Sequence, residues 1–498
     1  MSAAGPPRPP RGASALRWTG AGGAALLTVS AWAGVTAGAP VVGAFALAGG
    51  VAGTGLLVLA WALLGRPVLR GPAPSPAWSV RTLAAWTAPL LFAPPLFSRD
   101  VYSYLAQGEV ARRGLDPHVV GPATGLPADS AVLGRVDGYW TDSPSPYGPV
   151  STVLSRSIAG IADGDLVVGV GLHRLAAVLG LVALVWAVPR LCALSGAAPA
   201  TALWLGVLNP LVLWHLVAGL HNDALMLGLA LAGTVLALQA LPGRADARSG
   251  RPAPGDRPRW GPLALGVVLV CLGALVKAPV VVGLAVIGVA LADRARTLLV
   301  SAMGMLLSLV AVAVAVSGPT GVGFTWTRSM TTPGTLDSWM APTNWPGFLA
   351  GGVGAVLGAD GAALSRAVID AGRVTGLVLV VAGIGWLLLR QWRGRIGPVT
   401  ALGAILAVAV ALGPVLHPWY LLWAVLPLAA APLAVRTHAR IGVVAGVFAV
   451  LLPPLAGDFS GRAGLLVGGY AVAALVVAVG YVLLRRTAAD APAELAPV

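Results

Sequence analysis

The sequence predicts an all-α, polytopic integral membrane protein. Hydrophobic residues make up 57% of the 498 residues, and charged residues make up only 10%. Several apolar runs approach or exceed the roughly 20 residues that span a bilayer as a helix, which a soluble core does not require. The net charge of +14 comes from short arginine clusters between these runs. That is the positive-inside pattern of a membrane protein, and it argues against a nucleic-acid partner.

The apolar runs predict about twelve to fourteen transmembrane or half-membrane helices. Residues 1–17 are rich in Pro, Gly and Ala and are expected to form a disordered cytoplasmic tail. The first run ends in small residues, as a cleaved signal peptide does, but it continues directly into another span, which favours a retained anchor. The spans are expected at 18–38, 41–64, 82–97, 166–188, 198–218, 223–241, 262–276, 279–292, 297–316, 370–390, 397–415, 419–434, 441–456 and 464–484.

The arginine clusters assign the two sides of the membrane. If every cluster is cytoplasmic, an even number of spans separates successive clusters, and the apolar runs satisfy this with both termini inside. The loop 242–261 and the tail 487–498 then face the cytoplasm. The long loops 98–165 and 317–369 face outside and, with their edges, carry most of the acidic residues. Chemistry is therefore expected at the outer face of the plasma membrane. The loops divide the spans into three groups, at 18–97, 166–316 and 370–486.

The first outer loop opens with Arg-Asp-Val-Tyr-Ser-Tyr over 99–104, directly after an apolar run. Asp100 is the first acidic residue in the chain. An ionisable residue at a membrane boundary is a candidate functional group, and a helix over 101–113 would begin beside it, where an anionic side chain is favoured. The alternative is an interfacial anchor, because Tyr is common at headgroup level and Arg99 can pair with Asp100 in water.

Three further motifs of this loop have simpler structural interpretations. Asp116 precedes a proline in Gly-Leu-Asp-Pro-His, which indicates a turn. Tyr147 lies in Pro-Tyr-Gly-Pro, a rigid aromatic turn for which a loop brace is the simpler explanation. Asp163-Gly164-Asp165 formally matches a metal-binding Asp-x-Asp, but it is expected to cap the following span. There is no Walker loop, dinucleotide fingerprint or zinc spacing, so neither a metal nor a cofactor is expected.

Lys277 is the only lysine of the chain, and it lies in the otherwise almost wholly apolar stretch 262–292. Pro279 is expected to break the helix beside it, leaving half-helices or a re-entrant hairpin. A lysine in this position is costly unless an anion or water meets it, and a lipid phosphate is a suitable anion. The alternative is a lysine whose long side chain reaches the outer interface.

Two other outer-face motifs are candidates for binding. His221-Asn222-Asp223 forms the turn between two spans, where it is either a hydrated hairpin with a helix cap or a sugar- or phosphate-binding group. His-Pro-Trp-Tyr over 417–420 ends another span. Trp and Tyr are ordinary interfacial residues, whereas His-Pro is less usual there.

Together these motifs resemble the polyprenol-phosphomannose-dependent α-1,6-mannosyltransferases of actinobacteria, which belong to the GT-C superfamily of multi-span, lipid-donor glycosyltransferases. The resemblance extends roughly from Leu90 to Tyr420 and implies a GT-C architecture with the active site in extracytoplasmic loops. Its anchors are the motifs given above, with Asn-Pro-Leu at 209–211 and Lys-Ala-Pro at 277–279. His118 departs from the family, which often carries an aromatic residue after Asp-Pro, and this weakens an acceptor-stacking role for the position.

The resemblance implies transfer of mannose from polyprenyl-phosphate-mannose to an α-1,6-mannan acceptor of the lipomannan or lipoarabinomannan type. Asp100 matches the carboxylate assigned as general base in GT-C enzymes. An inverting displacement needs such a base near the acceptor hydroxyl and a cation near the departing phosphate. We therefore expect the donor phosphate to bind Lys277, Arg99 and His417. The expected substrate-binding residues are Tyr102, Tyr104, Asp116, Tyr147, His221, Asn222, Asp223, Trp419 and Tyr420.

A transporter or flippase of a polyprenyl-linked envelope precursor is the competing class. Many spans and a broken helix suit it. Against it, the ionisable residues gather on one face of the membrane, and the sequence shows no repeated halves.

Overall fold

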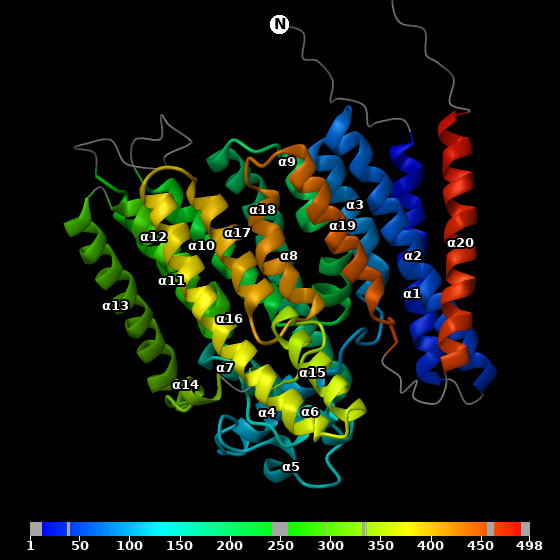
Figure 1. Cartoon of the computed structure of the whole chain (residues 1–498), viewed down its shortest axis with the longest axis horizontal. Helices are drawn as coiled ribbons and strands as arrows, with labels where there is room; N and C mark the ends of the chain where they lie inside the picture. The colour runs from blue at the N-terminus through cyan, green and yellow to red at the C-terminus, as the bar shows by residue number, and fades with distance from the viewer. Residues whose placement is uncertain are drawn as a thin grey trace, which may run out of the picture. The chain divides into compact units, whose positions relative to one another are not determined.

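The computed structural model describes residues 12–36, 40–241, 257–292, 294–330, 334, 336–455 and 463–489. All regular elements in these ranges are helices (Figure 1), which confirms the predicted all-α class. The described part of the chain contains five helices long and apolar enough to cross a membrane, or up to six if one bent pair counts as a span. Further apolar helices of 10–17 residues accompany them. The five are α2 (Pro40–Arg70), α8 (Leu166–Ser195), α13 (Ala295–Thr320), α16 (Gly361–Trp392) and α20 (Ala463–Ala489).

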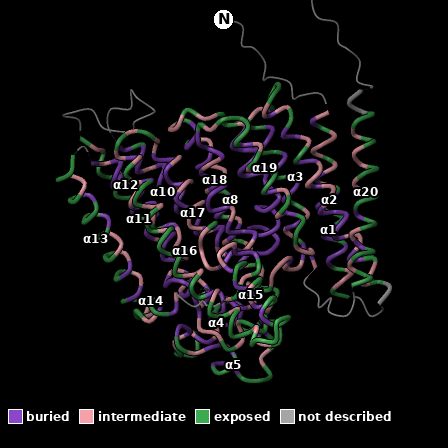
Figure 2. The backbone as a smooth tube through the Cα atoms, viewed as in Figure 1, coloured by how far each residue is buried: buried purple, intermediate pink, exposed green. Residues whose placement is uncertain are grey.

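Apolar surface on the long helices is consistent with a bilayer around the protein. Only 11% of the most apolar stretch of α16 is buried, and the same holds for α20, whereas the corresponding value for α2 is 56%. Figure 2 shows few buried positions along α20. Exposed aliphatic side chains along such long helices are stable in lipid, where the helix satisfies its own backbone hydrogen bonds.

The chain divides into two compact units. The first comprises Met1–Arg99, Ala198–Leu220 and Leu433–Val498. Besides α2 and α20 it contains α1 (Ala13–Thr36), α3 (Pro76–Leu90), α9 (Pro199–Ala202), η2 (Leu203–Val207), η3 (Val212–Ala218) and α19 (Val435–Leu451). Trp61 and Trp204 stack at 5.2 Å and each indole N–H donates to the other's carbonyl oxygen. These contacts hold α2 against η2.

The second unit comprises Asp100–Ala197 and His221–Pro432. Its N-terminal part contains α4 (Asp100–Arg112), α5 (Pro122–Gly125), α6 (Gly138–Thr141) and α7 (Pro149–Ala162) before α8. Its central part contains α10 (Asp223–Gln239), α11 (Trp260–Val276), η4 (Ala278–Val281), α12 (Val282–Leu291), α13 and α14 (Trp326–Ser329). Its last part contains η6 (Pro342–Asn344), α15 (Trp345–Val356), α16, α17 (Pro398–Leu412), η7 (Pro418–Tyr420) and α18 (Leu421–Ala429).

Glycines allow the helices that carry the site to approach closely. A Cβ on Gly180 of α8 would lie 2.3 Å from the carbonyl oxygen of Ala224, and one on Gly228 of α10 would lie 2.6 Å from that of Gly180. On α11, a Cβ on Gly273 would lie 2.9 Å from the carbonyl oxygen of Met226. Backbone therefore meets backbone, as is typical of small-residue helix packing in membranes, and this fixes the start of α10 near the end of α11.

Several predicted boundaries differ from the structure. The expected span 82–97 stops at Leu90, ahead of Pro94 and Pro95, which lack backbone donors and disfavour a helical conformation of the residues before them. The expected span 198–218 is bent by 58° between η2 and η3, where Asn209-Pro210 interrupts it. The expected loop 317–369 is partly helical, since α16 begins at Gly361, where the Asp360 carboxylate accepts from Ala363 N at 2.9 Å. Most of the arginine loop 242–261 lies outside the described residues.

Candidate functional site: two charged pairs on one turn

The turn His221-Asn222-Asp223 leads directly into α10, and Asp223 is the first residue of that helix. The Asp223 side chain is wholly buried. Its Oδ2 lies 2.9 Å from Lys277 Nζ, and its Oδ1 accepts from Trp423 Nε1 at 2.6 Å. A buried carboxylate is tolerated only with such partners. The ion pair and the indole N–H provide them.

Lys277 stands between two helices, as its neighbouring proline predicts. α11 ends at Val276, and Lys277 itself is extended, with φ −156° and ψ 129°. Its ammonium group lies 4.5 Å from the ring centroid of Tyr420 and 5.3 Å from that of Trp423. A cation over aromatic faces is stabilised by their quadrupoles. The Lys277 side chain is 13% exposed, so it is the accessible member of its pair with Asp223.

Asp100 and His221 form the second pair of the site. Asp100 is the first residue of α4, at the predicted helix start. His221 Nδ1 lies 3.2 Å from Asp100 Oδ2, and the His221 side chain is fully buried while that of Asp100 is 15% exposed. The His221 ring stacks on Trp419 at 3.9 Å, and Trp419 stacks on His417 at 4.5 Å. The carboxylate of Asp100 is therefore held by a histidine that is itself fixed by aromatic packing.

One turn thus supplies the buried partner of each pair. His221 and Asp223 are two residues apart, at most about 7 Å along the chain. Their partners, Asp100 and Lys277, have opposite charges and are the more exposed members. The arrangement brings a carboxylate and an ammonium group to one place, both oriented by residues that solvent does not reach.

The Pro-Tyr-Gly-Pro turn is fastened to the end of α11, directly before Lys277. Gly148 N donates to the carbonyl oxygen of Val276 at 3.1 Å, and a Cβ on Gly148 would lie 2.1 Å from the carbonyl oxygen of Leu275. Only glycine fits this approach. The turn also carries Tyr147, whose ring meets that of Tyr104 edge-on at 5.2 Å. Both tyrosines are buried.

The other predicted site residues have different surroundings. Asp116 accepts from His118 N at 2.9 Å and from Thr325 Oγ1 at 2.6 Å, so both of its oxygens hold loop segments. Tyr102 packs against an apolar cluster of the 98–165 loop. Asn222 Nδ2 donates to Ser151 Oγ at 3.4 Å. Arg99 is exposed. Their roles in substrate binding remain predictions.

His118, which departs from the expected aromatic residue, is a buried polar junction. Its Nδ1 lies 3.1 Å from the carbonyl oxygen of Ser145 and 3.2 Å from Ser329 Oγ, and its Nε2 lies 3.0 Å from Thr152 Oγ1. Burial lowers the pKa of His118 below its ordinary value of 6.5. A neutral ring suits these contacts, because one nitrogen can donate while the other accepts.

Trp423, which donates to Asp223 and lies beside Lys277, was not among the predicted site residues. The signal was its spacing: residues three apart on a helix share a face, and Trp423 follows Tyr420 by three, with the rings stacked at 4.1 Å. The Asp-x-Asp segment acts as predicted, since Asp165 Oδ1 caps α8 by accepting from Val167 N and Val168 N.

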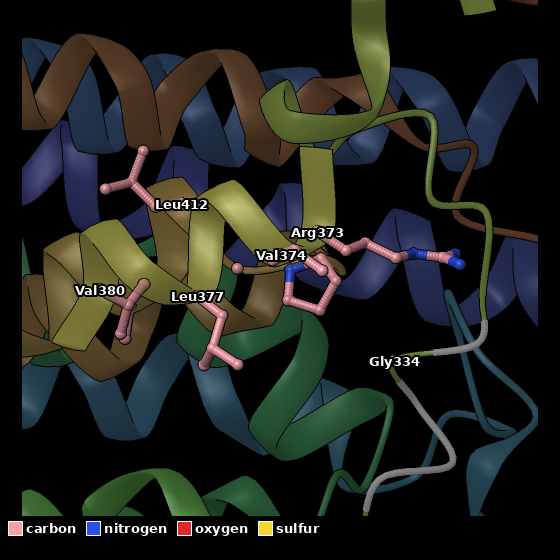
Figure 3. A pocket seen from close by; sticks show the side chains of 9 residues that line it. Gly334, Arg373, Val374, Leu377, Val380 and Leu412 are labelled. Carbon is pink, nitrogen blue, oxygen red and sulfur yellow. The ribbon is translucent and has the colours of Figure 1, made fainter. Parts of the chain in front are cut away.

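An apolar pocket of about 360 Å³ adjoins the segment that leads to His417. Figure 3 shows Val380, Leu377 and Val374 following one another along its wall, with Arg373 at one end. Gly334, two residues of α17 and the segment Gly413-Pro414 complete the lining. Pro414 is three residues before His417, at most about 11 Å along the chain. The pocket therefore lies close to His417, which stacks on Trp419 beside the pair of His221 and Asp100.

Comparison with known proteins identifies the family. The family model for the alpha-(1->6)-mannopyranosyltransferase N-terminal domain matches residues 12–293, more than half of the chain, and that for the MptB C-terminal domain matches residues 343–482. No solved structure matches the chain.

Curated relatives agree with the family models. A Mycolicibacterium smegmatis protein named "Probable alpha-(1->6)-mannopyranosyltransferase" is 41% identical over 390 residues, which cover 76% of this chain and 69% of that protein. A Mycobacterium tuberculosis alpha-(1->6)-mannopyranosyltransferase is 39% identical, with the same two coverages. Alpha-(1->6)-mannopyranosyltransferase B of Corynebacterium glutamicum is 36% identical over 79% of this chain and 66% of its own length. These findings decide against the transporter interpretation: the chain is a glycosyltransferase that belongs to the alpha-(1->6)-mannopyranosyltransferase family.

Proposed function

We propose that this protein transfers mannose from polyprenyl-phosphate-mannose to an α-1,6-mannan glycolipid at the outer face of the plasma membrane. The names of its relatives support the mannosyl transfer and its linkage. The single observation that carries the proposal is the turn at 221–223, which pairs with a carboxylate on one side and with the only lysine of the chain on the other.

Asp100 is the proposed general base. A carboxylate removes the proton from the acceptor hydroxyl as that oxygen attacks the anomeric carbon. His221 Nδ1 lies 3.2 Å from Asp100 Oδ2. In the proposed reaction it serves as the donor to Asp100, because an ionised carboxylate only accepts hydrogen bonds. His221 is therefore a positioning residue, which leaves the other lone pairs of Asp100 directed toward the acceptor.

Lys277 is the proposed partner of the leaving group. As the new bond to the anomeric carbon forms, the bond from that carbon to the phosphate oxygen breaks, and its electron pair stays on the phosphate. A fixed cation stabilises the charge that develops there. Asp223 and the rings of Tyr420 and Trp423 hold the ammonium group in place, and His417 lies beside Tyr420 at 5.2 Å.

The apolar pocket of Figure 3 is the proposed seat for part of the lipid chain of the donor. Apart from Arg373 at one end, its wall on α16 consists of aliphatic side chains, of which Val374 and Leu377 are more than 60% exposed. A polyisoprenoid chain is apolar enough to pack against these side chains, and the lining residue Pro414 lies three residues before His417. In this proposal the phosphate end of the lipid meets Lys277.

The experiment is a cell-free assay with membranes that contain the protein. Radiolabelled polyprenyl-phosphate-mannose and an α-1,6-mannose disaccharide are supplied, and the linkage of the product is determined. Transfer to the disaccharide in an α-1,6 linkage is expected. Membranes supplied with a nucleotide-linked mannose instead are the control, and transfer from that donor alone would overturn the proposed donor.

The outer-face assignment has its own test. Ala123 is exposed in the first long loop, and Ser249 lies in the arginine loop. In a background without Cys192 and Cys271, an impermeant thiol reagent applied to intact cells should label Ala123→Cys and not Ser249→Cys. The reverse pattern would place the site on the cytoplasmic side.

A further inference from the structure

A second cavity, of about 300 Å³, lies at the end of α4 opposite to Asp100. Its walls come from the last turns of α4, the loop at 127–132, the end of α7 and the start of α8. We call it the polar cavity and define it by its six charged lining residues, Glu109, Arg112, Arg113, Asp129, Asp163 and Asp165. None of these residues has a place in the transfer reaction proposed above.

The polar cavity has an apolar floor and a charged rim. Leu105 and Val132, which line it, are 5% and 8% exposed and belong to the buried cluster of the outer loop. The rim groups are largely accessible: the side chains of Arg112 and Arg113 are 42% and 43% exposed. A ligand that fits must have one apolar face and an edge rich in hydrogen-bonding groups.

Both arginines of the rim already have acidic partners, and this excludes some classes of ligand. Glu109 accepts from Arg112 at 2.7 Å and from Arg113 at 3.1 Å, and Arg112 lies 3.5 Å from Asp163. Four carboxylates against two guanidinium groups do not favour an anion. Within the described ranges, no group of three or more His, Cys, Asp or Glu residues is arranged to hold a metal ion. Paired ions still offer several donors and acceptors, which suit a neutral polyhydroxylated ligand.

The distance of the polar cavity from Asp100 matches the length of an oligosaccharide acceptor. Glu109 and Arg112 follow Asp100 by nine and twelve residues on one helix, a separation of roughly 14 to 18 Å at 1.5 Å per residue. A single hexose does not extend over this distance, but a chain of several does. We propose that the polar cavity is a remote subsite for the acceptor, which binds a sugar of the α-1,6-mannan several units away from the reacting hydroxyl. This inference rests on the proposed function, because it takes Asp100 as the reacting end.

The test compares acceptors of different length. Ala131→Trp places a large side chain in the polar cavity from an exposed lining position, and Arg113→Gln removes one charged donor from its rim. The ratio of kcat/KM for a long α-1,6-mannoside to that for the disaccharide is measured for each. We expect this ratio to fall about tenfold, the usual cost of a lost hydrogen bond to a charged group. Arg135→Gln is the matched control, since Arg135 is exposed in the same loop but does not line the cavity.

The outcomes separate the subsite from the proposed function. An unchanged ratio in both Ala131→Trp and Arg113→Gln, with intact transfer to the disaccharide, would overturn the subsite and leave the reaction standing. No mannosyl transfer by the unaltered protein would instead refute the proposed function. Saturation-transfer NMR provides a readout independent of turnover: inner sugars of the long mannoside should receive saturation from the protein, and Ala131→Trp should abolish this signal.

Discussion

Asp223 and Lys277 are separated by 54 residues in the sequence, yet their charged groups meet at 2.9 Å and the Asp223 side chain has no exposed surface. Removing one member of a buried pair leaves an uncompensated charge, which typically costs about 3–5 kcal/mol. The pair therefore has to be tested as a unit. Loss of activity in a single variant would not distinguish a structural contact from a contact with the substrate.

A double substitution makes that distinction. Lys277→Met alone should destabilise the protein by about 3–5 kcal/mol, because it leaves Asp223 charged and buried. Adding Asp223→Asn removes the charge, and melting of the purified protein should return toward that of the unaltered form. Turnover of the double variant should stay roughly 10- to 100-fold low, since the cation for the phosphate is still missing. Lys277→Arg should keep part of the activity. Full turnover in the double variant would make the pair purely structural.

His221 should act on the rate rather than on donor binding. His221→Phe keeps an aromatic ring against Trp419 but loses the ring nitrogen that lies 3.2 Å from Asp100, which we propose as its donor. We expect kcat to fall about 10- to 100-fold, the worth of a hydrogen bond to a charged group, with the affinity for the lipid donor almost unchanged. Separate measurements of single-turnover rate and donor binding check this. A variant that loses donor affinity and keeps its rate would show that His221 contacts the donor.

The Pro-Tyr-Gly-Pro turn should not tolerate a side chain at Gly148. The Cβ of Gly148→Ala would overlap the carbonyl oxygen of Leu275, so the turn must move away from α11. Overpacking of this kind costs about 1–3 kcal/mol, and the displacement also shifts Tyr147. Gly134→Ala is the matched control, because nothing lies within 4 Å of its added Cβ. Equal melting temperatures and turnover in the two variants would contradict the close fit.

The loop 98–165 should lose stability at mildly acidic pH because of His118. Its pKa is lower in the folded protein than its ordinary value of 6.5, mainly because it is buried. As the pH falls below that value, the unfolded chain binds a proton that the folded chain does not, so the free energy of unfolding decreases. His118→Gln should flatten this dependence below pH 6.5, at a lower stability at neutral pH. A melting temperature with the same pH dependence in both proteins would contradict the assignment.

Local chemistry explains what the sequence predicted. The break at Lys277 follows from Pro279, and the start of α4 at Asp100 follows the prolines that end the preceding run. Each of these features depends on residues within a few positions of one another. The all-α membrane class could be predicted from composition and apolar run length, because neither of these depends on contacts between distant residues.

Long-range pairing explains what could not be predicted. Nothing near Asp223 in the sequence indicates that Lys277 and Trp423, 54 and 200 residues further on, are its partners. His221, Asn222 and Asp223 looked like equivalent binding residues, but tertiary packing buries two of them as supports for other groups. The helical part of the expected loop 317–369 was missed because Gly-rich, apolar α15 is short and folds against α16.

In the proposed reaction, Asp100 accepts the proton of the acceptor hydroxyl. Asp100→Asn keeps the size of the side chain and can still accept a hydrogen bond from His221, but it cannot act as a base at neutral pH. The decisive measurement is turnover per folded molecule, with binding of the lipid donor followed separately. If Asp100 is the base, we expect normal insertion and donor binding with turnover reduced by roughly 10²–10⁴-fold. Near-normal turnover in Asp100→Asn would contradict it.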